Sequence, residues 1–211
     1  SLDDTSLLGI KITEATLNAL VENKGLIQAD GGAVYLTASG RDSLLNTVVN
    51  NDGLIQARSL GIQNGQVVLM AEGGDAVSTG TIDVSGQHVG EKGGTVVVSG
   101  NRIGLFGNAS IDASGVTGGG RVVIGGDLLG TATDVVNISL ADSTVIGPNV
   151  RIKVGSAQGD GGFVETSGKS LTMLGEVDGK SAGKGSEWLI DPTDITINNA
   201  ASTATNTSNN W

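Results

Sequence analysis

The stretch "IQADGGAVYLTA", residues 27–38, is matched 28 residues later by "IQARSLGIQNGQVVLMA", which begins at Ile55. Both stretches alternate apolar and polar residues, and both place glycine between two short segments of this alternation. Successive side chains of a β-strand point to opposite faces, so each segment has one apolar face. The pattern predicts pairs of short strands, joined at glycines, that recur along the chain.

The repeat continues through most of the sequence. Isoleucines at 27, 55, 82 and 111 are separated by 28, 27 and 29 residues. A small residue lies two positions before each of them: Gly25, Gly53, Gly80 and Ala109. A second strand follows in each unit, and it always has a glycine two positions ahead of a valine: Gly32, Gly65, Gly94, Gly120 and Gly162.

The alternation assigns side chains to an inner and an outer face. The first strands point their isoleucines inward and place Gln28, Gln56, Asp83 and Asp112 in an outward ladder. The second strands point these residues inward: Val34, Leu36, Val67, Leu69, Val96, Val98, Val122 and Ile124. Less regular third strands are predicted in "LLNTVVN" from Leu44, "IGLFG" from Ile103 and "VRIKV" from Val150.

A unit of about 28 residues cannot bury its inward faces alone, whereas stacked copies form a continuous core and pair their strands. The sequence therefore predicts an all-β fold, a parallel β-helix of seven or so coils, each of 27–29 residues. A β-sandwich also has short, evenly spaced strands, but it does not require the same residue to return at the same place. The glycines are expected to permit left-handed or tight corners.

Three regions are expected along the chain. Residues 23–197 form the β-helix domain, and residues 1–22 form a lead-in that does not fit the repeat. Within this lead-in, "TEATLNALVENKG" from Thr13 is compatible with a short helix or with a strand. Residues 198–211 are polar and without period, which predicts a poorly ordered tail or linker.

Composition excludes several classes of partner. The 211 residues carry a formal net charge of -10, which argues against nucleic acid and anionic membrane as partners. No apolar run approaches the 18 residues of a membrane span. Cysteine is absent, as suits either a cytosolic protein or one exported unfolded. The chain begins at Ser1, so we expect a piece of a longer protein whose export signal lies elsewhere.

Two late motifs carry a family resemblance. "GDGGFVETSG" (159–168) followed by "SEWLIDPTDITI" (186–197) resembles the filamentous haemagglutinin-like exoproteins of Gram-negative bacteria, in particular the high-molecular-weight adhesin branch. "GLIQADGGAVYLTA" (25–38) and "IDASGVTGGGRVVIGGD" (111–127) are similar to segments of the same proteins. The resemblance implies a right-handed β-helix, secretion through a dedicated outer-membrane transporter by the two-partner route, and adhesion.

The sequence departs from that family in one respect. Its secretion domains usually carry Asn-Pro motifs, whereas the prolines here are Pro148 and Pro192 and neither follows an asparagine. We therefore expect a piece from the C-terminal part of the secretion domain or just beyond it. The function expected is attachment at the cell surface to a receptor such as a glycan. The alternatives are a β-helix enzyme acting on acidic polysaccharide and a purely structural stalk.

We predict no catalytic, cofactor or metal site. A polysaccharide-cleaving β-helix needs clustered carboxylates or calcium with a nearby base, and the 12 basic residues here are scattered. His88, the single histidine, is expected to be a solvated loop residue. Asp83 and Asp112 could hold a cation, although a solvated outer face is favoured. "GGGRVVIGGD" lacks the Lys-Ser/Thr ending of a nucleotide-binding loop.

Three further sets of residues are singled out. Outward positions of the second strands form an apolar stripe that predicts either a partner-binding surface or, as favoured, a face covered by extra strands: Tyr35, Val68, Val97 and Val123. Asn-x-Ser sequons are either glycosylation sites or, as favoured, chance occurrences: Asn108, Asn137 and Asn206. A cap that closes the last coil is predicted from Trp188 and Ile190, with Pro192 turning the chain away.

Overall fold

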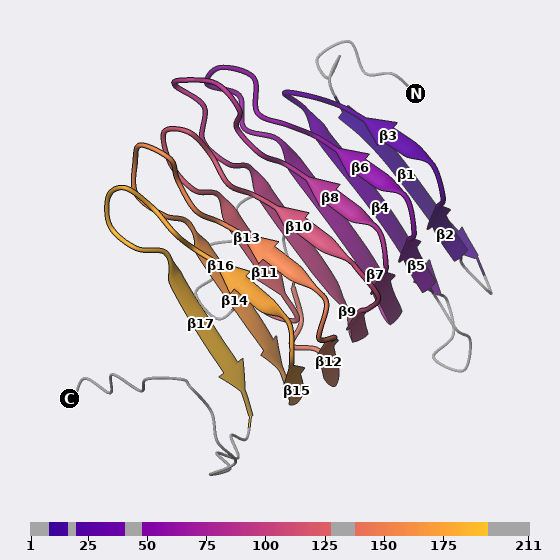
Figure 1. Cartoon of the computed structure of the whole chain (residues 1–211). Coiled ribbons are helices and arrows are strands. Elements are labelled where there is room, and N and C mark those ends of the chain that lie inside the picture. Colours follow the sequence, from indigo (N-terminus) through magenta and orange to yellow (C-terminus); the bar gives the residue numbers. More distant parts are fainter. Residues whose placement is uncertain (1–8, 17–19, 41–47, 128–137, 194–211) are drawn as a thin grey trace.

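A computed structural model describes residues 9–16, 20–40, 48–127 and 138–193. These residues form seventeen strands and no helix. Every pair of named strands runs parallel, and the strands stack into a β-solenoid of about six turns (Figure 1). The predicted all-β, parallel, stacked architecture is confirmed.

One sheet consists of the six short strands that begin each coil. The isoleucines at 27, 55, 82 and 111 lie in register within it, and Ile152 and Val177 continue the row. This register was predicted for the first four coils and is confirmed. The strands are β3 (Leu26–Gln28), β6 (Leu54–Gln56), β8 (Thr81–Asp83), β10 (Ser110–Asp112), β13 (Arg151–Lys153) and β16 (Glu176–Asp178).

The second sheet has eleven strands in two rows and lies behind the short-strand sheet in Figure 1. Its main row is β1 (Gly9–Thr16), β4 (Ala33–Gly40), β7 (Gln66–Ser78), β9 (Thr95–Leu105), β11 (Arg121–Ile124), β14 (Phe163–Gly168) and β17 (Glu187–Pro192). The C-terminal parts of β7 and β9 belong to the second row, which also holds β2 (Leu20–Asn23), β5 (Val48–Asn51), β12 (Ser143–Ile146) and β15 (Ser170–Met173).

The core lies between the two sheets. All eight residues predicted to point inward from the second strands are buried, with exposed fractions of 1% or less. They pack with Ile55, Ile82 and Ile111 of the short-strand sheet in one apolar cluster. Each fully buried Val, Leu or Ile side chain contributes about 1.5–3 kcal/mol through the hydrophobic effect, so this cluster is the main source of the rod's stability.

A buried polar ladder occupies one corner of the first coils. Asn23, Asn51 and Ser78 lie in register, and the Asn23 side-chain amide donates to Asn51 Oδ1 at 2.9 Å. The Asn51 amide donates to Ser78 Oγ at 3.3 Å. Later coils fill the same position with Leu105 and Ile146. The corner therefore changes from a hydrogen-bonded ladder to an apolar one along the rod.

The ladder makes Asn51 a sensitive position, because its side chain is fully buried and bonds in both directions. Asn51→Ala leaves the neighbouring polar groups without their partner and is expected to cost about 1–3 kcal/mol of unfolding free energy. Urea unfolding would measure this loss. Asn101→Ala, at an exposed position of β9, is the control and should be nearly neutral. Equal free energies of unfolding for the two variants would contradict the ladder's role.

The glycines that precede the second strands have a different role from the one expected. A Cβ atom added to Gly94 would lie 2.2 Å from the carbonyl oxygen of Gly65, and one added to Gly120 would lie 2.1 Å from that of Gly94. A Cβ on Gly162 would lie 2.0 Å from the Gly120 oxygen. The left-handed backbone occurs at other glycines, such as Gly61 and Gly107. These recurring glycines thus allow close stacking of one coil on the next.

The structure moves one predicted third strand to the other sheet and selects one of the two alternatives for the lead-in. "VRIKV" forms β13, which pairs with β10 as a first strand, while the third strand of that coil is β12. The reason is the long segment after β11, which shifts the phase of the repeat. In the lead-in, the strand alternative holds: β1 pairs with β4 and β2 pairs with β5, so the stacked strands begin before residue 23. The predicted tail, residues 198–211, lies outside the described residues.

Candidate functional site

The apolar stripe is covered over most of its length. Val68, Val97 and Val123 are in register and have exposed fractions of 1% or less. They form a second apolar cluster, separate from the core, with Tyr35, Met70 and Ile138 packed against it. Ile138 belongs to the segment that follows β11. Of the two alternatives, the structure therefore shows the covered face, and these three valines offer no surface to a partner.

The outward ladder on the short-strand sheet lies in the predicted register. Its two aspartates are held by neighbouring side chains: Asp83 accepts from Ser85 Oγ and from Arg58 Nε, both at 2.6 Å. Asp112 accepts from Ser114 Oγ at 2.6 Å, and Lys153 Nζ lies 3.8 Å from it. Within the described ranges, no group of three or more metal-ligating side chains is present. The carboxylates thus act as links between coils.

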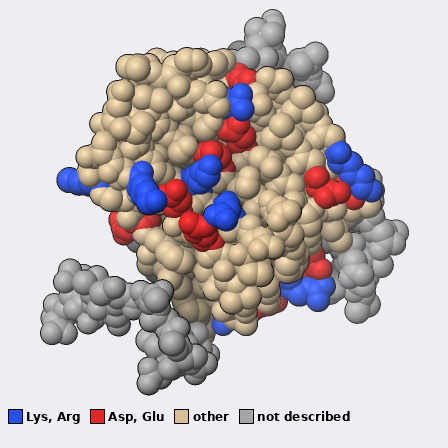
Figure 2. Space-filling model, in the orientation of Figure 1, with Lys and Arg blue, Asp and Glu red and all other residues tan. Residues whose placement is uncertain are grey.

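Charged residues of both signs run along this face of the rod. Figure 2 shows them as a band across the short-strand sheet, from its N-terminal to its C-terminal coils. Arg151 pairs with Glu176 of the next coil, and Arg58 pairs with Asp83 of the next coil. Exposed pairs of this kind contribute little individually, about 0–1 kcal/mol each. Their alternation instead favours one stacking register over others.

His88 and Glu91 lie in a corner loop, where the Glu91 carboxylate accepts several hydrogen bonds. Glu91 is nearly buried and accepts from the backbone N–H groups of Gly61, Gln87 and His88 at 2.9–3.1 Å. His88 Nδ1 lies 3.1 Å from the same carboxylate, while the His88 side chain itself is 76% exposed. These bonds, the one from Gly61 first, lower the pKa of Glu91 to about 2.

This depressed pKa makes part of the stability depend on pH. A carboxyl group whose pKa falls on folding stabilises the folded state above its ordinary pKa of 4.5. That contribution is lost as pH falls from 4.5 through about 2. Glu91→Gln should therefore melt lower than the unchanged chain at pH 7, with the gap closing below pH 4. Glu72→Gln, at an exposed carboxylate, should show no gap, and a constant gap for Glu91→Gln would contradict the assignment.

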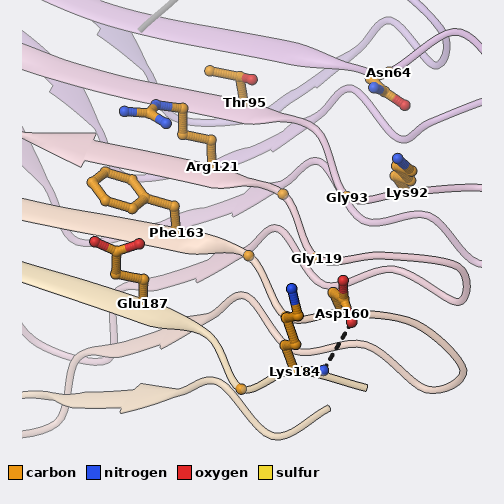
Figure 3. Close-up of a pocket in the computed structure, with 14 residues that line it drawn as sticks. Asn64, Lys92, Gly93, Thr95, Gly119, Arg121, Asp160, Phe163, Lys184 and Glu187 are labelled. Carbon is orange, nitrogen blue, oxygen red and sulfur yellow. Dashed lines mark hydrogen bonds between the residues drawn. The ribbon is translucent and has the colours of Figure 1, made fainter. Parts of the chain in front are cut away.

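A groove of about 490 Å³ runs along the corner where the loops enter the main row of the second sheet. Figure 3 shows its two walls. One wall is formed by residues in register at the starts of four strands: Thr95, Arg121, Phe163 and Glu187. The other wall comes from the corner loops: Asn64, Lys92, Asp160 and Lys184.

The floor of the groove is made of glycines, which stacking requires. A Cβ atom on Gly119 would lie 2.0 Å from the Val154 carbonyl oxygen, and one on Gly161 would lie 2.2 Å from Ser186 Oγ. The floor's backbone groups are already used, since Gly119 N–H donates to the Asp160 carbonyl and Gly161 N–H to that of Lys184. A ligand in this groove would therefore bind through the side chains of the walls.

Arg121 and Phe163 form the centre of one wall. The Arg121 guanidinium carbon lies 4.2 Å from the centre of the Phe163 ring, a cation–π contact between neighbouring coils. Asp127 Oδ1 lies 4.0 Å from the same guanidinium. A smaller groove of about 360 Å³ follows the other side of the corner loops, where Lys153, Asp178 and Lys180 contribute to its lining.

The predicted glycosylation site that the structure describes does not line the groove. Asn108 is exposed in the turn between β9 and β10, whereas Asn137 and Asn206 fall outside the described residues. Glycosylation of Asn108 stays a prediction.

The predicted cap residues belong to the final strand. Trp188 stacks on Val164 and donates from Nε1 to Thr166 Oγ1 at 3.1 Å, and Ile190 lies opposite Thr166. The turn away from the rod predicted at Pro192 stays a prediction, and Pro192 itself pairs opposite Gly168 as the last residue of β17. It can do so because β17 is an edge strand, where its missing N–H is tolerated. Capping itself stays a prediction.

Sequence reasoning missed the groove and the Glu91 corner. The Glu91 corner and the loop wall of the groove combine residues from loops of different coils that follow no period, so no pattern in the sequence marks them. The strand wall does recur, since Thr95, Arg121 and Phe163 each follow one of the repeated glycines. The asparagine ladder could have been predicted, because Asn23, Asn51 and Ser78 recur with the same spacing as the isoleucines, 28 and 27 residues apart.

Comparison with known proteins adds one relative. The chain is similar to the crystal structure of the HMW1 secretion domain from Haemophilus influenzae, with 30% sequence identity and a TM-score of 0.61. The match covers 82% of this chain and 49% of the other, so the chain spans about half the length of that secretion domain. No protein-family model and no curated protein sequence matches. None of the described residues form a helix that could cross a membrane.

Proposed function

We propose that this chain is a β-helical segment of an adhesin-type exoprotein of the filamentous haemagglutinin-like family. In this proposal it is exported by the two-partner route, displayed at the cell surface and used in attachment. The observation that carries the proposal is the similarity to the HMW1 secretion domain, 30% identity over 82% of the chain. The late motifs at 159–168 and 186–197, which resemble the same family, agree with it.

The construction of the rod is compatible with export before folding. Each coil contacts mainly its neighbours, so such a stack can grow coil by coil from one end. The sequence has no cysteine, so no disulfide can form during passage through an oxidising compartment. Both properties support a chain that crosses the outer membrane extended and folds outside.

Secretion is tested in a Gram-negative host that expresses the exoprotein containing this segment, with and without its outer-membrane transporter. We expect surface and medium fractions to contain the protein only when the transporter is present. The chain alone, with a signal peptide, tests whether this segment includes the recognition element. Equal surface amounts of the exoprotein without the transporter would contradict the two-partner assignment.

Attachment is tested separately by comparing adhesion of cells that display the exoprotein with cells from which residues 23–197 are deleted in frame. Loss of adhesion at equal surface amounts is expected. Unchanged adhesion would favour a stalk.

The enzymatic alternative has its own measurement. Asp83 and Asp112 are already bonded to serines and cations, so we expect no cleavage of acidic glycans by the purified chain. A turnover signal abolished by Asp83→Ala or Asp112→Ala would overturn the adhesin proposal.

A further inference from the structure

Most cations described by the structure are paired with carboxylates. Four pairs join side chains of neighbouring coils at the surface: Arg58–Asp83, Arg102–Asp75, Arg151–Glu176 and Lys169–Asp142. Such pairing is expected of a chain with a net charge of -10, where carboxylates outnumber cations. Among the described side chains, a cation without a carboxylate partner is therefore the exception.

Three lysines depart from this rule, and all three lie on the same corner. Lys92, Lys180 and Lys184 form no ion pair within the part of the chain that the structure describes. Lys92 and Lys184 line the larger groove, and Lys180 lines the smaller one. In Figure 3 the Lys184 side chain points between the two walls.

The two groove lysines are separated by three coils. Lys92 is bridged to Gly118 and Gly118 to Asp160, and the Lys184 N–H donates to Asp160 Oδ1 at 2.8 Å. At roughly 4.8 Å per coil, their backbone positions are about 14 Å apart along a straight groove. One coil advances by a distance comparable to one sugar ring. The lysines would therefore meet separated anionic groups of an extended ligand.

The other lining residues indicate what lies between those anionic groups. Asn64 and Thr95 are neutral hydrogen-bonding side chains, and Asp160 and Glu187 supply carboxylates. Carboxylates accept hydrogen bonds from hydroxyls but repel a ligand with dense negative charge. Arg121 covers one face of the Phe163 ring, so a base cannot stack on that face. The lining thus favours a hydroxyl-rich chain with spaced anions over a nucleic acid.

We propose that this groove binds an extended acidic polysaccharide, with Lys92 and Lys184 contacting its carboxylate or sulfate groups. The proposal deepens the attachment function above and rests on it for its biological role, but the binding itself is a property of this chain. The carboxylates of the groove accept bonds from sugar hydroxyls, and no bond of the ligand is cleaved.

The test is calorimetric titration of the 211-residue chain with defined octasaccharides. Hyaluronan carries only carboxylates, chondroitin sulfate carries carboxylates and sulfates, and dextran is neutral. At least one acidic chain should bind, more weakly as salt rises, and dextran should not. The double variant Lys92→Ala/Lys184→Ala should bind about tenfold more weakly, since it removes both ammonium groups proposed to contact the anions.

The matched control is the double variant Lys169→Ala/Arg102→Ala, which removes the same charge from two ion-paired cations outside the groove. It should bind like the unchanged chain, and thermal melts should show that both variants are folded. The proposal is overturned if neither acidic octasaccharide binds, if the two double variants bind equally, or if oligothymidylate binds as tightly as the better glycan. These results need no transporter or cell, so they are separate from the secretion and adhesion outcomes.

Discussion

Replacing Val96 with aspartate is expected to lower the free energy of unfolding by about 3–5 kcal/mol, because the new charge would be buried without a partner. Val96 is fully buried and lies in register between Val67 and Val122 in the middle of the rod. A globular domain is stable by only about 5–15 kcal/mol, so this variant should melt far lower or fail to fold. Urea unfolding followed by circular dichroism measures the effect.

Val97→Asp separates the covered stripe from an exposed one. From the sequence, Val97 points outward and its substitution should cost far less unless the stripe is covered. The structure buries Val97 completely in the second apolar cluster, so a loss of several kcal/mol is expected here as well. Ile62→Asp, at a side chain that is 97% exposed, is the control and should be neutral. If Val97→Asp behaved like this control, the cover would be refuted.

Gly119→Ala is the second substitution expected to lower the stability strongly. The added Cβ would lie 2.0 Å from the Val154 carbonyl oxygen and 2.2 Å from the Gly162 nitrogen, both backbone atoms of the next coil. The two coils must separate to make room, which would strain the hydrogen bonds between them. We expect a loss of about 1–3 kcal/mol or more in unfolding free energy.

The same row of glycines provides the control for this substitution. Gly185 follows Gly119 and Gly161 in register, but it belongs to the last coil and has no atom within 4 Å of an added Cβ. Gly185→Ala should therefore change the free energy of unfolding by less than about 1 kcal/mol, in either direction. Equal losses in the two variants would show that backbone flexibility, rather than stacking, explains the glycines.

The sequence predicts the stacking of the coils well because equivalent residues of successive coils occupy the same environment. Ile27, Ile55 and Ile82 align by their spacing alone, since only one register keeps all of them inside. The prediction fails at Val150, where the longer coil after β11 displaces the period. Periodicity reports which residues are equivalent only while the coils keep the same length.

A repeat pattern cannot predict contacts between residues that are not equivalent in successive coils. The cover over Val97 involves Ile138, which follows no repeat, so the sequence could only leave exposed and covered faces as alternatives. The groove combines Lys92 and Lys184 from loops three coils apart. Their proximity follows from the stack, but the unpaired state of their ammonium groups depends on side-chain positions that a strand pattern does not specify.

The stacked register itself is tested most directly by distances between spin labels. The chain lacks cysteine, so Gln28→Cys can be combined with Lys153→Cys in one sample and with Asp178→Cys in another without competing sites. These positions are four and five coils apart in register. At roughly 4.8 Å per coil, we predict mean distances of about 19 and 24 Å, differing by one coil. Distances that did not increase by one strand spacing from the first pair to the second would contradict the solenoid.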